Sequence, residues 1–154
     1  PQRAQAIRKA AGELDIGMVE ETVSHSADVP GAYRRMRTKV DALWMLPDPV
    51  VVTRDNFAYL EDRSRRDGIA FLAFSENFVR AGALVSVSPS YETMGSQAAA
   101  LLERLLNDPN RPPAVQAPLG SRLVINGTTA EALGLVIDSE TTKMTDTIVS
   151  PEDH

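Results

Sequence analysis

Residues 41–74, DALWMLPDPVVVTRDNFAYLEDRSRRDGIAFLAF, decide the fold. The stretch opens and closes with apolar runs at 41–46 and 69–74, which are too short for independent helices and are typical of strands buried on both faces. Between them, Thr53 can cap a helix of about 14 residues, and Gly68 can end it. A strand, a helix and a second strand in this order predict two parallel strands joined by a right-handed crossover.

The same alternation continues on both sides of this unit. Spacing and turn signals predict helices at 2–14, 31–39, 75–80, 91–106 and 128–133, and strands at 16–23, 83–87 and 122–126. The fold class predicted is therefore α/β, a doubly wound parallel sheet with helices on both faces, with Trp44 in its core. Such a sheet normally opens on a strand near its middle, whereas this chain opens on a helix. We therefore expect the first strand of the unit to be missing.

The composition excludes several classes of protein. The 154 residues carry a formal net charge of −5 and no cysteine, which excludes disulfides, thiolate metal sites and cysteine nucleophiles. An acidic chain lacks the clustered cationic charge that nucleic acids require, so we expect no nucleic-acid partner. No apolar run approaches the roughly 20 residues of a membrane-spanning helix. Common phosphate-binding, hydrolase and metalloprotease motifs do not occur, so we expect no enzyme, no cofactor and no metal site.

The negative charge is concentrated at the end of the chain. Residues 138–154 contain five carboxylates against Lys143, while the rest of the chain is close to neutral. This segment is rich in Thr and Ser and has no sustained periodicity, so we expect an extended or disordered acidic tail, which could hold a short edge strand at 147–149. The predicted organisation is a ligand-binding α/β lobe at 1–137 and the tail at 138–154.

Polar side chains follow each predicted strand. In a parallel sheet the carboxyl ends of the strands and the beginnings of the next helices meet at one edge, where ligands commonly bind. The residues expected at that edge are Ser24, His25, Ser26, Pro47, Asp48, Phe74, Ser75, Glu76, Ser88, Ser90 and Tyr91. Carboxylates, hydroxyls and rings together fit a small polar or zwitterionic molecule with an apolar portion. The candidate ligand-binding residues are Asp48, Pro47, Ser75, Glu76, Phe74, Ser90 and Tyr91.

Each candidate also has a purely structural interpretation. Asp48, between two prolines, can form an Asx turn. Ser75 and Ser90 occupy helix N-cap positions, and Glu76 lies in a first helical turn, where the helix dipole favours a carboxylate. The rings of Phe74 and Tyr91 can face either the cleft or the core. The sequence alone leaves these alternatives open.

A receiver-type signalling domain, or another one-lobe sensor or interaction module, is the alternative function. Receivers share the alternating fold, and Asp48 stands after a buried strand, as a phosphoacceptor would. They also need an acidic pair after the first strand and a lysine after the last strand of the sheet. The first strand is not present here, and the lysines are Lys9, Lys39 and Lys143. These requirements disfavour the receiver.

Four stretches, in order, carry a resemblance to a known family. Residues 40–48 resemble its strand and turn that end in Pro and Asp, and residues 80–84 (RAGAL) resemble its Arg-x-Gly-Ala-Leu segment. Residues 90–98 resemble its Tyr-x-x-x-Gly-x-x-Ala helix start, and residues 123–134 its Ile-Asn-x-x-Thr-Ala-x-x-Leu-Gly segment. The family is that of the periplasmic substrate-binding proteins of ABC transporters, in particular the aromatic amino acid binders. The resemblance covers about residues 2–135, nearly everything but the tail.

Family members have two α/β lobes that close on a solute, and this chain matches only the second lobe and the C-terminal part. The resemblance implies that Asp48 holds a ligand ammonium, and that Ser75, Glu76 and Tyr91 face the cleft. It also implies capture of a small solute, such as an amino acid, and delivery to ABC permease subunits. The site would be completed by the missing first lobe or by a partner chain. The implied location is periplasmic or otherwise extracytoplasmic, with or without a membrane tether.

Overall fold

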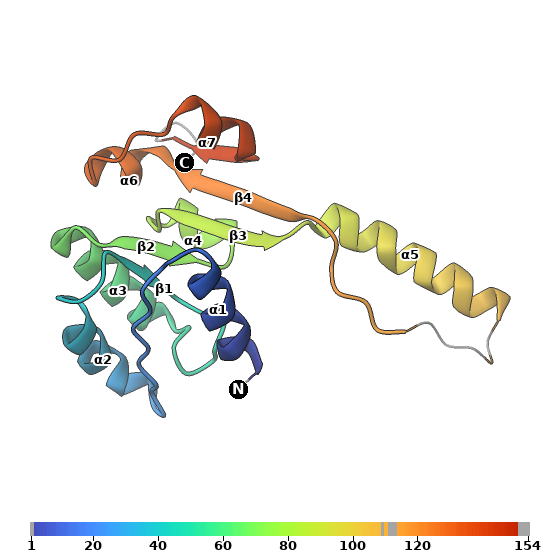
Figure 1. Cartoon of the computed structure of the whole chain (residues 1–154), viewed down its shortest axis with the longest axis horizontal. Helices are drawn as coiled ribbons and strands as arrows, with labels where there is room; N and C mark the ends of the chain where they lie inside the picture. The colour runs from blue at the N-terminus through green and yellow to red at the C-terminus, as the bar shows by residue number, and fades with distance from the viewer. Residues whose placement is uncertain (1, 109, 111–113, 151–154) are drawn as a thin grey trace.

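The computed structural model describes residues 2–108, 110 and 114–150, with the side chains of residues 2–4 left aside. A five-stranded sheet organises these residues (Figure 1). The strands are β1 (Ala42–Trp44), β2 (Ala70–Ala73), β3 (Val85–Pro89), β4 (Ser121–Asn126) and β5 (Thr147–Val149). The helices are α1 (Gln2–Glu13), α2 (Val29–Met36), α3 (Arg54–Asp67), α4 (Glu76–Arg80), α5 (Tyr91–Asn107), α6 (Gly127–Ala132) and α7 (Ser139–Met144), and a 3₁₀ turn spans Ser26–Asp28.

The strands lie in the order β1-β2-β3-β4-β5, and the pairs β1–β2, β2–β3 and β4–β5 are parallel. The predicted α/β class is confirmed, but β4 departs from the expected parallel direction, because it runs antiparallel to β3. The cause is α5, which extends away from the sheet instead of packing back on it (Figure 1). The chain therefore returns to the end of β3 that it left, where the Ser90 amide donates to the Gly120 carbonyl at 3.3 Å.

The main core lies between the sheet and the helices α2 and α3. Thr53 caps α3 by accepting from the Asn56 amide at 3.2 Å, and Gly68 ends the helix at a φ of +70°, as the sequence predicts. The buried residues of this core are Val29, Tyr33, Leu43, Met45, Leu60, Ile69, Phe71, Ala73 and Ala83. The Phe57 ring packs at a tilt against the rings of Phe71 and Phe78, with centroid distances of 5.7 and 4.8 Å.

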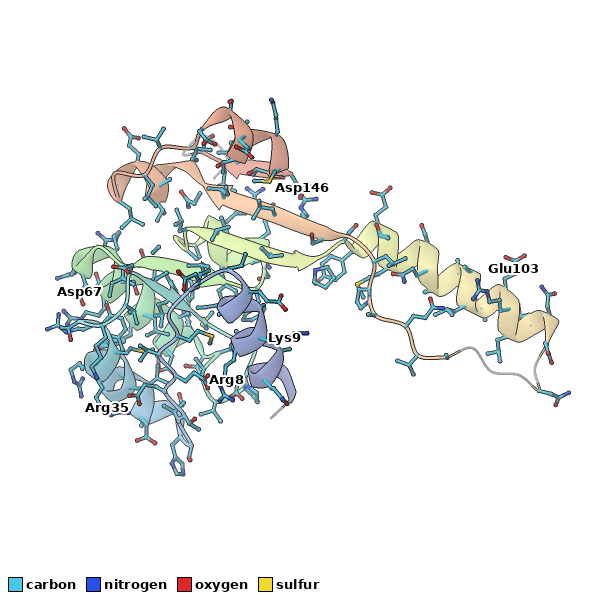
Figure 2. All side chains as sticks on the ribbon, viewed as in Figure 1. Arg8, Lys9, Arg35, Asp67, Glu103 and Asp146 are labelled. Carbon is cyan, nitrogen blue, oxygen red and sulfur yellow. The ribbon has the colours of Figure 1, made fainter. Side chains whose placement is uncertain are left out.

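The prediction of a strand at 16–23 is wrong. This segment is extended but pairs with no strand that the structure describes, and Ile16, Met18 and Val19 are exposed. Surface ion pairs hold it instead: Glu20 pairs with Arg8 of α1, and Glu21 pairs with Arg35 of α2 at 2.6 Å (Figure 2 labels both arginines). An extended apolar segment forms a β-strand only when its backbone makes hydrogen bonds to a neighbouring strand. The spacing of apolar residues along the sequence does not reveal whether such a neighbour exists.

The prediction that Trp44 belongs to the core is also wrong. β1 is the first strand of the sheet, and its side chains alternate: Leu43 and Met45 are buried against the helices, whereas the Trp44 side chain is 51% exposed. β2 alternates in the same way, with Phe71 and Ala73 buried and its other residues half-buried. The two apolar runs therefore form half-buried strands and not strands buried on both faces.

The expectation of an extended or disordered tail is wrong for residues 139–149. Asp138 caps α7 by accepting from the Thr141 amide at 2.7 Å, and this bond lowers the pKa of the Asp138 carboxyl. β5 then pairs with β4, which confirms the short edge strand at 147–149. Val149 is 1% exposed and packs with Val79 and Val124 in a second small core. Residues 151–154 of the expected tail lie outside the described residues.

Asn126 joins three elements, which makes its side chain a sensitive point for stability. Its buried Nδ2 donates to the Val79 carbonyl of α4 at 2.8 Å, and its Oδ1 caps α6 by accepting from the Thr129 amide at 2.9 Å. The substitution Asn126→Ala should lower the free energy of unfolding by about 2–3 kcal/mol in urea denaturation, because it removes a cap and leaves a buried carbonyl unpaired. The control Asn77→Ala, at an exposed position of α4, should change it by less than about 0.5 kcal/mol. Equal effects of the two substitutions would contradict this account.

The raised pKa of Tyr33 predicts how the free energy of unfolding changes at alkaline pH. Burial, together with donation to Asp67 Oδ2 at 2.8 Å, raises the pKa of Tyr33 from 10.0 to about 12. Because the pKa is higher in the folded state, the stabilisation is complete below pH 10 and is lost as the pH rises from 10 to 12. Denaturation midpoints measured across this range should fall less steeply for Tyr33→Phe than for the unaltered chain. The control Tyr59→Phe keeps Tyr33 and should keep the steep fall; a Tyr33→Phe profile that falls just as steeply would refute the assignment.

Candidate ligand-binding rim

The carboxyl ends of β1, β2 and β3 face the same edge of the sheet, because these strands are adjacent and parallel, and β3 continues three residues beyond Ser86, the partner of Ala73 at the end of β2. We call this edge of the sheet the rim and define it by residues 46–50, 74–76 and 89–91. The structure thus brings all seven predicted site residues to one edge, on turns that follow three different strands. β4 begins beside the same edge, since Ser121 is in register with Pro89.

Asp48 forms the turn after β1 and keeps its charge at the surface. Its Oδ1 accepts from the Val50 amide at 2.8 Å, so the turn-forming interpretation is correct. Its carbonyl also accepts from the Val52 amide at 2.8 Å, which leads the chain toward α3. Asp48 and the preceding Pro47 are exposed, and no group among the described residues donates to Asp48 Oδ2. One carboxylate oxygen is therefore positioned by the turn, while the other faces solvent.

Phe74 and Ser75 differ in what they can offer a ligand. The Phe74 ring packs edge-on against the Phe78 ring, with 5.0 Å between the ring centroids. Both rings pack against the main core, so Phe74 chiefly connects the rim to that core. Ser75 occupies the N-cap position of α4 as predicted, but its side chain makes no capping hydrogen bond. The half-buried Ser75 hydroxyl is therefore not committed to the helix.

Glu76 is already neutralised by two cations. Its carboxylate lies 2.7 Å from Arg80 on the same helix and 3.2 Å from Arg122 of β4. Arg122 also donates to Thr147 Oγ1 at 3.0 Å, which ties this cluster to β5. A carboxylate that is held by two guanidinium groups is a poor partner for a ligand ammonium. Glu76 thus organises the junction of α4, β4 and β5.

Sequence reasoning missed Arg80 and Arg122 as neighbours of the rim. The spacing of Glu76 and Arg80, four residues apart on a predicted helix, is a readable signal for an ion pair. Arg122 approaches Glu76 only because β4 lies next to β3, and no local pattern announces that pairing.

Ser90 and Tyr91 mark the point where the chain leaves the sheet. Ser90 Oγ accepts from the Thr93 amide at 3.3 Å and from Thr93 Oγ1 at 3.0 Å, so Ser90 is the predicted N-cap of α5. Tyr91 is 78% exposed and belongs to no core. Gly120 crosses close to this turn at a φ of +75°, where a Cβ would lie 3.3 Å from Thr93 Oγ1. The Tyr91 residue is thus open to solvent at the end of the rim that follows β3.

The rim is exposed at Pro47, Asp48 and Tyr91. A cavity of about 80 Å³ lies elsewhere, between α2, β1 and α3, and none of the predicted site residues lines it. Small-molecule sites normally bury most of the ligand in a concave pocket, so the rim by itself offers one half of such a site. Among the described residues, no cluster of His, Asp and Glu could hold a metal ion. No described helix has the length and apolar character that crossing a membrane requires.

Comparison with known proteins identifies the family. The sequence model described as "ABC transporter substrate binding protein" matches residues 2–149. The chain belongs to this family. No curated protein matches it.

Three solved structures share the fold of this family member. A conserved domain protein from Vibrio cholerae O1 biovar El Tor is 26% identical, with a TM-score of 0.75 over 96% of this chain and 50% of its own. The ABC domain from Streptococcus pneumoniae, solved in complex with L-Trp, is 18% identical with a TM-score of 0.73 over 96% of this chain and 50% of its own. A ligand-free, open substrate-binding protein with adhesive properties from Clostridium difficile is 19% identical, with a TM-score of 0.72 over 96% of this chain and 48% of its own. The chain spans about half the length of these structures.

The capping role of Ser90 predicts a local effect at the rim. Ser90→Ala should destabilise the first turn of α5 by about 1 kcal/mol, so amide exchange at residues 91–94 should accelerate about fivefold. Ser96→Ala serves as the control, because the Ser96 hydroxyl donates to the Glu92 carbonyl within the helix and caps nothing. Nuclear magnetic resonance can follow both variants. Unchanged exchange in Ser90→Ala would show that the cap does not hold the helix.

Proposed function

We propose that this family member forms one lobe of a two-lobe solute-binding protein, which captures a small solute for the permease of an ABC transporter and leaves it chemically unchanged. The convergence of Asp48, Ser75 and Tyr91 on the rim, from three parallel strands, is the observation that carries the proposal. Family membership supports it, as does the match of this chain to about half the length of the solved structures. We place the protein outside the cytoplasmic membrane, where such a permease collects its substrate.

A second lobe follows from the open rim. A ligand on the rim is covered from one side only, although the cost of immobilising it is the same as in a closed site. Closure of a second surface over the rim would bury the ligand on both sides and strengthen each polar contact by excluding water. An isolated lobe should therefore bind far more weakly than the two-lobe protein.

The exposed surface of α5 indicates where the other lobe sits. Figure 1 shows α5 extending away from the sheet, and no described side chain of α5 is buried. Its apolar residues include Leu102, Leu105 and Leu106, the last 71% exposed. Side chains of this kind normally pack against protein. We assign this helix to the surface that the other lobe covers.

The chemistry of the rim favours an amino acid as the solute. Asp48 offers a carboxylate to an ammonium group, Ser75 offers an uncommitted hydroxyl, and Tyr91 offers a ring to an apolar side chain. Glu76 is left out of this set because Arg80 and Arg122 neutralise it. The Streptococcus neighbour was solved with L-Trp, a ligand of the same chemical class.

Calorimetric titration of the two-lobe protein against a panel of amino acids tests the proposal. Asp48→Asn keeps an oxygen for the turn and removes the charge, so it should weaken binding by about 1–3 kcal/mol while the fold is retained. Asp48→Ala removes both and should weaken binding at least as much. Asp41→Asn is the matched control, because Asp41 is exposed at the opposite end of β1, and it should leave affinity unchanged.

Two results would overturn parts of the proposal. If Asp48→Asn binds as tightly as the unaltered protein, Asp48 serves only its turn. If no amino acid releases heat while a solute of another class binds, the amino acid assignment is wrong and capture of a solute stands.

A further inference from the structure

We propose that Asn56, a buried residue of α3, is a positioning residue for Asp48. Its side-chain amide fixes the loop 48–52, and that loop fixes the direction of the Asp48 carboxylate. Asn56 does not contact the solute and acts only through Asp48. This inference rests on the proposed function, in which Asp48 receives the ammonium group of an amino acid.

Asn56 lies in the first turn of α3, the helix that Thr53 caps. It is 5% exposed, whereas asparagine residues are mostly found at the surface of proteins. A buried amide costs free energy unless its hydrogen-bonding groups are satisfied. The surroundings of Asn56 must therefore supply acceptors for its two side-chain protons.

Three acceptors from two other segments surround Nδ2 of Asn56. It donates to Ser26 Oγ at 2.9 Å, and it lies 3.3 Å from the Val51 carbonyl and 3.4 Å from the Val50 carbonyl. An amide nitrogen has two protons, so Ser26 receives one and the two carbonyls share the other. Ser26 begins the 3₁₀ turn ahead of α2. Asn56 thus ties that turn and the loop 48–52 to the start of α3.

Val50 connects Asn56 to Asp48. The Val50 carbonyl accepts from Asn56 and from no other described residue, whereas the Val50 amide donates to Asp48 Oδ1 at 2.8 Å. Asn56 therefore holds the residue whose amide orients the carboxylate. A carboxylate that is oriented before the solute arrives loses less freedom on binding, which strengthens its bond to an ammonium group.

Apolar packing is the competing explanation for the order of this loop. Val51 and Val52 pack against the main core, and their amides donate to the Asp48 carbonyl at 3.1 and 2.8 Å. These contacts hold the middle of the loop, and none of them involves the Val50 carbonyl. The two explanations differ in what happens when Asn56 loses its donor while the valines stay in place.

The substitution Asn56→Asp separates the two explanations, because it keeps the size of the side chain and replaces the donor by an acceptor. A carboxylate is favourable in the first turn of a helix, so α3 should still form. In the two-lobe protein, amide exchange at Val50 should accelerate about tenfold or more, and the affinity for L-tryptophan in calorimetry should fall about tenfold. If L-tryptophan does not bind, the amino acid of the panel that binds most tightly is used instead.

Two comparisons distinguish positioning from a general loss of stability. Asn126→Ala removes a buried side-chain amide at the end of β4 away from the rim, and it should leave Val50 exchange and affinity within about twofold of the unaltered protein. A double-mutant cycle pairs Asn56→Asp with Asp48→Asn. Because Asn56 acts through Asp48, adding Asn56→Asp to Asp48→Asn should change affinity by less than about twofold.

Unchanged Val50 exchange in Asn56→Asp, or equal acceleration in Asn126→Ala, overturns the inference. A tenfold loss of affinity that persists in the Asp48→Asn background also overturns it, since Asn56 would then act by another route. If Asp48→Asn alone leaves affinity unchanged, the proposed role of Asp48 fails, and Val50 exchange still decides whether Asn56 positions the carboxylate.

A variant that does not fold leaves the inference testable. Asn56→Ala then replaces Asn56→Asp, with the same expected results, because it removes the same donor without adding an acceptor. If neither variant folds, exchange is measured on the unaltered protein at increasing urea. The Val50 amide and the Asn56 side-chain amide should open together; an opening constant more than about tenfold larger for Val50 refutes the inference.

Discussion

The parallel pairing of β1, β2 and β3 is the constraint on which the rest of the structure depends. Strands that run in one direction must end on one edge, so the turns after them collect side chains that are far apart in sequence. Asp48, Ser75 and Tyr91 lie on the same edge of the sheet for that reason alone. The helices between the strands bury the core and leave the rim without cover. We propose that this exposed surface is half of a binding site, a proposal that family membership supports.

Local chemistry made much of this predictable from the sequence. Thr53 and Ser90 cap helices through bonds to nearby amides, and Gly68 ends α3 in the left-handed conformation that glycine adopts easily. The apolar runs at 41–46 and 69–74 became strands because their length and flanking turns permit little else. The rim followed from these elements, since the order of strands and helices already implies a common edge. In each case the signal and the contact lie within a few residues of each other.

What the sequence did not reveal depends on neighbours in space. Segment 16–23 has the pattern of a strand, but no strand among the described residues pairs with it, and Trp44 is half-exposed because β1 stands at the edge of the described sheet. Both errors arise because a local sequence pattern cannot tell whether another strand lies alongside in space. Residues 147–149 show the converse: a short Thr-Ile-Val stretch becomes a strand because β4 offers its edge, which places Val149 in a core. The role of Glu76 changed for the same reason, when β4 brought Arg122 beside it.

The most direct test of the central claim is to map chemical shifts on the two-lobe protein as an amino acid is titrated into it by nuclear magnetic resonance. If the rim receives the solute, the largest shifts in this half of the protein will fall at 46–50, 74–76 and 89–91. Shifts that gather instead around the cavity between α2, β1 and α3, with the rim unchanged, would contradict the account.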